Sequence, residues 1–254
     1  MPKLILTARA LYSKGQFDEA VNDYNESLEL YPNHAVTYYG RGVAYARKGD
    51  LDRAIADFNK AVELNPCFAD VYYNRALAYY EKGNLEQAIK DSTKAIETNP
   101  RYAEAYNNRA GSYREKGQLD LAIADYSKAI AINSKYAIAY CNRGTAYGMK
   151  DDLDRAISDF SKVIEQDPCS SSGYCNRGLA YFRKGDFDLA IADSTKAIEH
   201  DPKNTDAYLN RAEAFLGKRD YGKSWADVHR IEVLNGNVDP ELLERLKRES
   251  GRER

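Results

Sequence analysis

Asparagine recurs at a fixed spacing of 34 residues through the middle of the chain. The positions are Asn74, Asn108, Asn142, Asn176 and Asn210. A carboxamide both donates and accepts hydrogen bonds, so it can hold the backbone amides of a bound peptide whatever side chains that peptide carries. In a second interpretation, each asparagine bonds the next helix and only sets the geometry of the chain. The spacing therefore indicates either a peptide-binding line or a structural one.

Arginine and aspartate recur with the same spacing. The arginines are Arg41, Arg75, Arg109, Arg143, Arg177 and Arg211, and the aspartates are Asp23, Asp57, Asp91, Asp125, Asp159, Asp193 and Asp227. An unpaired buried charge is very costly, so buried or half-buried arginines need carboxylate partners. We expect a structural ladder in which each arginine pairs with an aspartate of its own repeat or of the preceding one. The alternative is that the arginines line a ligand groove.

The remaining reactive side chains do not form a pattern typical of catalysis or metal binding. The four cysteines and three histidines are scattered without a metal-ligand spacing, and we interpret the cysteines as structural or neutral thiols. An aspartate that recurs in every repeat is typical of structure, because catalytic carboxylates are singular. The sequence therefore predicts a non-enzyme with no cofactor and no metal.

These side chains belong to a 34-residue repeat. The segment 35–68 matches 69–102 position for position, and the frame continues at 103–136, 137–170 and 171–204, with looser copies at 1–34 and 205–238. Glycine at position 15 of most repeats and proline at position 32 divide each repeat into two helices. Apolar residues between them recur at three and four residues, and no stretch alternates as a strand does. The chain is predicted to be all-α.

The residues at the repeated positions resemble the tetratricopeptide repeat (TPR) family. That family has a large residue at position 4, a small one at 8, tyrosine at 11, alanine at 20 and proline at 32. Position 4 here holds tyrosine from Tyr38 to Tyr208, and position 11 holds it from Tyr45 to Tyr181. The resemblance implies a right-handed superhelical α-solenoid of seven helix–turn–helix units over 1–238, namely 1–34, 35–68, 69–102, 103–136, 137–170, 171–204 and 205–238. Residues 239–254 are predicted to form a capping helix and a charged tail.

The resemblance also implies where a ligand binds. In this family the first helix of each unit lines a concave groove, and the recurring asparagines are similar to the asparagine ladder of O-GlcNAc transferases, which holds an extended polypeptide. Aromatic and cationic groove positions are Tyr39, Arg47, Tyr73, Tyr80, Arg114 and Arg183. Glutamates such as Glu81 add the opposite sign, which favours a peptide with both charges. The lysines that clamp chaperone C-termini in this family are absent from repeat positions 2 and 5.

Two segments depart from the regular pattern. The first repeat begins with the apolar Leu4, Ile5 and Leu6, so we expect this end to meet a partner or a second copy, or to follow residues that were removed. The sixth repeat begins with a serine-rich stretch that includes Ser170, which predicts a weak helix start and a soft joint.

The composition limits the functions that are open. Lysine and arginine total 37 and aspartate and glutamate 39, a net charge of −2, which argues against nucleic acid as a partner. No apolar run approaches the roughly 18–20 residues that span a membrane. We expect a cytoplasmic protein–protein interaction scaffold that binds an extended peptide or partner protein; an upstream targeting segment stays open. The alternatives are a self-assembling scaffold and the targeting domain of a larger enzyme.

Overall fold

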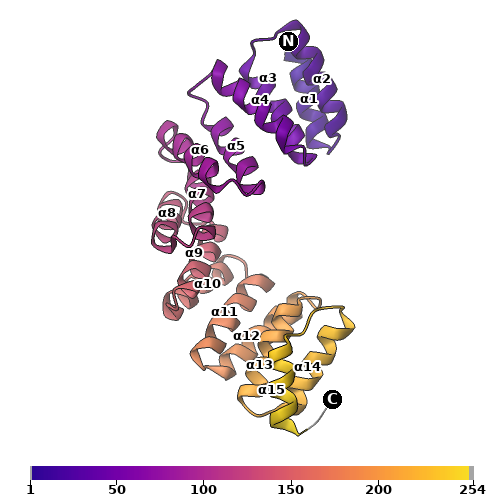
Figure 1. Cartoon of the computed structure of the whole chain (residues 1–254), viewed down its shortest axis with the longest axis vertical. Coiled ribbons are helices and arrows are strands. Elements are labelled where there is room, and N and C mark those ends of the chain that lie inside the picture. Colours follow the sequence, from indigo (N-terminus) through magenta and orange to yellow (C-terminus); the bar gives the residue numbers. More distant parts are fainter. Residues whose placement is uncertain (1, 252–254) are drawn as a thin grey trace. The chain divides into compact units, whose positions relative to one another are not determined.

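The computed structural model describes residues 2–251, which are all helices and connecting turns without a strand (Figure 1). The helices are α1 (Pro2–Ser13), α2 (Phe17–Leu30), α3 (Ala35–Arg47), α4 (Leu51–Leu64), α5 (Ala69–Glu81), α6 (Leu85–Thr98), α7 (Ala103–Glu115), α8 (Leu119–Ile132), α9 (Ala137–Met149), α10 (Leu153–Gln166), α11 (Ser171–Lys184), α12 (Phe187–His200), α13 (Thr205–Gly217), α14 (Tyr221–Val233) and α15 (Pro240–Ser250). The predicted all-α class is confirmed.

The chain forms two compact units, residues 1–134 and 135–254. In the first unit, α1 to α8 pack as consecutive pairs, and in the second, α9 to α14 do the same before α15. Each pair consists of a first helix and a second helix in chain order, joined by a short turn. The division into seven repeats and the right-handed superhelix stay predictions.

The turns inside the helix pairs use left-handed backbone, as glycine at repeat position 15 predicts. Gly49 has φ of +80° and Gly185 has φ of +86°, a conformation that costs glycine nothing because it has no Cβ. Asp151 occupies the same place with φ of +63°. Aspartate tolerates this region better than most residues, so the turn keeps its left-handed conformation without glycine.

Side chains cap several of the helices that follow. Asp50, Asn84 and Asp152 each accept a hydrogen bond from a backbone N–H in the first turn, whereas Asp186 does not. The prediction of a weak start for the sixth repeat was wrong. Ser170 caps α11 because its hydroxyl accepts from the N–H of Gly173 at 3.2 Å, which satisfies a donor that the helix leaves free.

Small residues in the first helices allow close packing inside each pair. A Cβ added to Gly42 of α3 would lie 2.7 Å from the ring of Phe58 of α4. Phe58 is fully buried with Ala54 and Ala61, so the ring fills the space that glycine leaves. Packing of the large Phe58 ring against the small Gly42 sets the separation of the two helices.

The first and last described helices differ in how their apolar residues are covered. At the C-terminal end, Leu242 and Leu246 of α15 are fully buried against Trp225, whose indole donates to Ser250 at 3.3 Å. Trp225 is thus buried in the core here, and α15 lies where the capping helix is predicted. On α1, Ile5 is buried, but Leu6 is 61% exposed.

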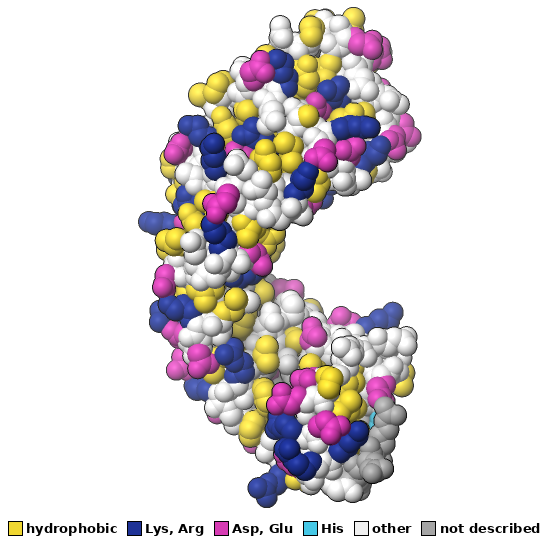
Figure 2. Space-filling view, in the orientation of Figure 1, with side chains coloured by type: hydrophobic (Ala, Val, Ile, Leu, Met, Phe, Trp, Pro, Cys, Tyr) yellow, Lys and Arg dark blue, Asp and Glu magenta, His cyan; other side chains and the backbone are white. Residues whose placement is uncertain are grey.

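The surface is mixed in charge. Figure 2 shows lysine and arginine side chains interspersed with aspartate and glutamate, without a broad field of one sign on the face in view. Within residues 2–251, none of the helices is both long and apolar enough to cross a membrane.

Candidate peptide-binding surface

The recurring arginines pair with the aspartates of their own repeat. In each of the six pairs, Nε and Nη2 of the arginine donate to the two carboxylate oxygens of the aspartate sixteen residues later, with shortest separations of 2.6–2.8 Å. The pairs are Arg41–Asp57, Arg75–Asp91, Arg109–Asp125, Arg143–Asp159, Arg177–Asp193 and Arg211–Asp227. Such two-pronged pairs fix the first helix against the second in both distance and orientation.

The third guanidinium nitrogen ties neighbouring helix pairs together. Nη1 of Arg75 donates to Oδ1 of Asn59 at 2.7 Å, one repeat earlier, and the guanidinium carbon lies 5.5 Å from the ring centre of Tyr72. In the second unit, Nη1 of Arg177 donates in the same way to Ser161 at 3.0 Å. These donors are occupied within the stack, which matches the structural ladder expected from the sequence.

The recurring asparagines also bond inside the stack through their amide nitrogen. Nδ2 of Asn74 donates to the Tyr39 hydroxyl at 3.1 Å and to the Asp70 carbonyl at 2.8 Å. Nδ2 of Asn210 donates to the Cys175 carbonyl at 3.2 Å. These bonds match the structural interpretation for the donor half of the amide.

A cavity of about 460 Å³ opens in the first unit, and we call it the N-terminal cavity. It is lined from α1, α3 and α5, the first helices of three successive pairs, and from the second helices α2 and α4. The side chains that matter below are Arg9, Tyr12, Tyr24, Tyr39, Val43, Arg47, Asn74, Leu77 and Glu81, together with Gly40. Of the predicted site residues, Tyr39, Arg47 and Asn74 are therefore brought together.

Hydrogen bonds and burial set the chemistry of this cavity. Nε of Arg47 donates to the Tyr12 hydroxyl at 2.9 Å, a bond that raises the pKa of the guanidinium. Burial, with a smaller contribution from Asp70, raises the pKa of Tyr39 to about 12. Tyr39 is therefore a neutral donor at physiological pH. The cavity combines apolar walls with a few fixed polar groups, which is typical of ligand sites.

A second cavity of about 180 Å³ lies in the unit 135–254, and we call it the C-terminal cavity. It is lined by Thr145, Gly148, Met149, Leu153, Phe160, Asn176, Leu179 and Arg183, among others. Arg183 is held by Asp151 at 2.9 Å and by the Gly148 carbonyl at 2.8 Å. Asn176 and Arg183, both predicted site residues, thus share this cavity.

The other predicted site residues lie outside both cavities. Tyr73 packs against Tyr102 with ring centres 5.1 Å apart, and Tyr80 and Arg114 both contact Glu115. Asn108 is buried and donates to Ser92, and Asn142 lies half-buried on α9. Sequence reasoning missed Arg9, Tyr12 and Tyr24. The signal for Tyr24 is Gly40, which stands where later repeats have asparagine.

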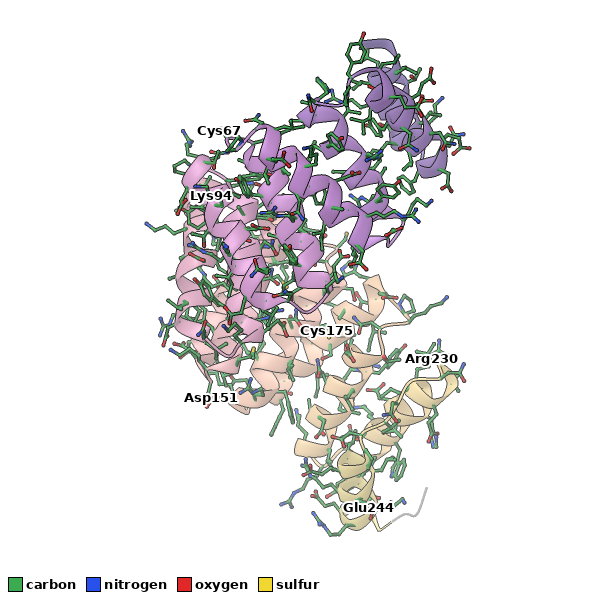
Figure 3. The ribbon with its side chains drawn as sticks, turned by 45° about the horizontal axis from the view of Figure 1, so that its top comes forward. Cys67, Lys94, Asp151, Cys175, Arg230 and Glu244 are labelled. Carbon is green, nitrogen blue, oxygen red and sulfur yellow. The ribbon has the colours of Figure 1, made fainter. Side chains whose placement is uncertain are left out.

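The cysteines are free thiols. Cys67 is exposed at the turn after α4, and Cys175 is buried within α11 (Figure 3). Burial raises the pKa of Cys175 to about 12, which keeps this thiol protonated and unreactive. No group of three metal-binding side chains occurs in the described part of the chain.

Family models identify the repeat. Tetratricopeptide repeat models match residues 5–66, 69–102, 93–124, 137–168 and 171–204, and a TPR repeat model matches 110–151. The chain belongs to the tetratricopeptide repeat family. The TPR α-solenoid expected from the sequence is therefore confirmed. Members of this family are generally non-catalytic.

Solved TPR structures resemble the chain over most of their length. A structure of MamA is 32% identical, over 63% of this chain and 94% of MamA, with a TM-score of 0.59. YrrB, described as a TPR protein with an unusual peptide-binding site, is 25% identical over 72% of this chain and 95% of its own, with a TM-score of 0.61. A tetratricopeptide repeat protein from Parabacteroides merdae, 22% identical over 98% of both chains, shares the fold with a TM-score of 0.72. No curated protein matches the chain significantly. Together, the TPR repeats and these neighbours support a protein-interaction scaffold.

Proposed function

We propose that this TPR protein is a non-catalytic scaffold that binds an extended peptide or partner protein along the first helices of its repeats. The observation that carries the proposal is that both cavities open at these helices and that each contains a recurring asparagine, Asn74 or Asn176. The description of YrrB as a peptide-binding TPR protein supports it.

The asparagines contribute to binding through their carbonyl oxygens. Nδ2 of Asn74 is already occupied by Tyr39 and Asp70, and Nδ2 of Asn176 lies 3.6 Å from Sγ of Cys141. A donor held inside the stack fixes the orientation of the amide, so Oδ1 is pre-positioned to accept a backbone N–H of the peptide. Pre-positioning of this kind improves affinity because less freedom is lost on binding.

Selection from a library of random 12-residue peptides on the immobilised chain tests the proposal. Peptides should be retained, and their affinity should fall about fivefold for Asn74→Ala or Asn176→Ala, since one hydrogen bond is lost in each. Asn22→Ala on the exposed side of α2 is the matched control. Circular dichroism checks that helicity is unchanged. Retention of no peptide, or equal affinity for all variants, would refute the proposal.

Self-association is the alternative that one observation favours. Leu6 on α1 is 61% exposed beside the buried Ile5, an apolar side chain that a second copy of the chain could cover. Sedimentation across micromolar concentrations distinguishes the two functions. A dimer that Leu6→Lys dissociates would favour self-assembly, and a monomer throughout would reject it.

We further propose that the chain does not bind nucleic acid and acts in the cytoplasm. The net charge of −2 and the mixed surface in Figure 2 support the first statement, because phosphate binding favours a basic footprint. A filter-binding assay at low salt, with duplex DNA and single-stranded RNA as probes, tests it. Retention of either probe would contradict it.

A further inference from the structure

One buried tyrosine in the N-terminal cavity keeps a hydroxyl that the fold does not use. Tyr24 of α2 is only 3% exposed and lines the cavity, yet its hydroxyl makes no hydrogen bond with the described residues. Phe58 and Phe160 occupy the same repeat position in other helix pairs and are buried without a hydroxyl, whereas Tyr126 at that position also carries one. Packing at this position does not require the oxygen, so the Tyr24 hydroxyl is available to a group that enters the cavity.

Gly40 leaves the space that the Tyr24 hydroxyl occupies. A Cβ added to Gly40 of α3 would lie 2.6 Å from Cζ and 2.7 Å from the hydroxyl oxygen of Tyr24. Gly40 stands at the repeat position where Asn74 and the later asparagines stand. In this helix pair, glycine therefore stands in place of the recurring asparagine, and the Tyr24 hydroxyl lies beside it at the cavity wall.

The charges around the hydroxyl favour an anion. Arg9 and Arg47 both line the cavity, and neither has a carboxylate partner among residues 2–251. Burial raises the pKa of Tyr24, and the positive charge of Arg9, which lines the same cavity, opposes that rise. Glu81 is the opposing charge in the lining, which leaves two guanidinium groups against one carboxylate.

We propose that the N-terminal cavity reads an aspartate or glutamate side chain of the bound peptide, with the Tyr24 hydroxyl and the Arg9 guanidinium donating to its carboxylate. Arg47, held by Tyr12, adds a second positive charge. A neighbouring apolar residue of the peptide contacts Val43 and Leu77. This inference rests on the proposed function and adds the chemistry that this cavity selects.

The test uses the strongest 12-residue peptide selected on the wild-type chain and its counterpart with each acidic residue changed to the amide. Isothermal titration compares both peptides, each with a free and an amidated C-terminus. The variants are Tyr24→Phe, which removes only the hydroxyl, and Arg9→Gln. Tyr113→Phe, a half-buried tyrosine of α7 outside the cavity, is the matched control. Thermal unfolding checks that all three variants fold.

The acidic peptide should bind wild type about tenfold more tightly than its amide counterpart, because hydrogen bonds to a charged group are the stronger ones. Tyr24→Phe and Arg9→Gln should remove most of that difference, and Tyr113→Phe should leave it. Equal binding of the two peptides, or an effect of C-terminal amidation alone, would overturn the inference and leave the proposed function standing. Retention of no peptide from the library would overturn both.

Discussion

The N-terminal cavity and the C-terminal cavity of this TPR protein occupy equivalent repeat positions and differ in their chemistry. Arg47 and Glu81 line the N-terminal cavity, and Met149 and Arg183 stand in their places, 102 residues later, in the C-terminal cavity. Arg183 is paired with Asp151, whereas Arg47 donates to the Tyr12 hydroxyl. The comparison teaches that the repeat fixes where a cavity lies, and that a few lining positions decide what it can bind.

The scaffold around both cavities uses the same arginine–aspartate pair. We expect Asp91→Ala in the first unit and Asp193→Ala in the second each to lower the free energy of unfolding by about 3 kcal/mol, because each leaves a mostly buried guanidinium unpaired. Urea unfolding followed by circular dichroism measures the loss. The double variant Arg75→Met/Asp91→Leu should recover most of it. If only one of the two aspartate variants lost stability, the arginine–aspartate pairs would not have the same role in both units.

Two glycines at the cavities should respond in opposite directions. Gly40→Ala places a methyl group against the Tyr24 ring and should destabilise the protein by about 2 kcal/mol through overpacking. At Gly148 the nearest atom to an added Cβ is Nη1 of Arg183 at 3.7 Å, an ordinary contact. Gly148→Ala should therefore stabilise by about 0.5 kcal/mol through helix propensity. Thermal unfolding compares the two variants. A change in stability in the same direction for both would contradict the difference in packing around the two glycines.

The smallest effect concerns exposed lysines that bridge successive helix pairs. Lys82 pairs with Asp52, and Lys184 pairs with Asp154 at 2.6 Å, at equivalent places in the two units. Both carboxylates are more than 80% exposed. Lys82→Ala and Lys184→Ala should each lower the free energy of unfolding only slightly at low salt, and less at 0.5 M salt because the charges are screened. A cost above that of the aspartate variants would show that the bridges, not the buried pairs, hold the stack.

The repeat made most of the fold predictable. Glycine at position 15, proline at 32 and the small residues facing Phe58 are local signals that each recur several times, so one misread position changes little. The pairing of Arg75 with Asp91 was also within reach, because both recur in register and a buried charge needs a partner. The sequence could not show whether each arginine pairs with the aspartate of its own repeat or of the preceding one, because that depends on how the helices cross.

The site was less predictable because its residues break the repeat. The repeat pattern did not single out Tyr24, and its contact with Gly40 at the cavity wall is seen only in the structure. Arg114 was placed in the groove, yet it is held by Glu115 and lies outside both cavities. Singular residues and side-chain rotamers decide such contacts, and periodicity carries no information about either.

Photo-crosslinking from the first helices tests the central claim most directly. A photoreactive residue at Leu77 in the N-terminal cavity, or at Leu179 in the C-terminal one, should give covalent adducts with the library-selected peptide. The same residue at the exposed Lys90 of α6, outside both cavities, should give none. Mass spectrometry identifies the adducts. Adducts at Lys90 with none at Leu77 or Leu179 would contradict peptide binding along the first helices.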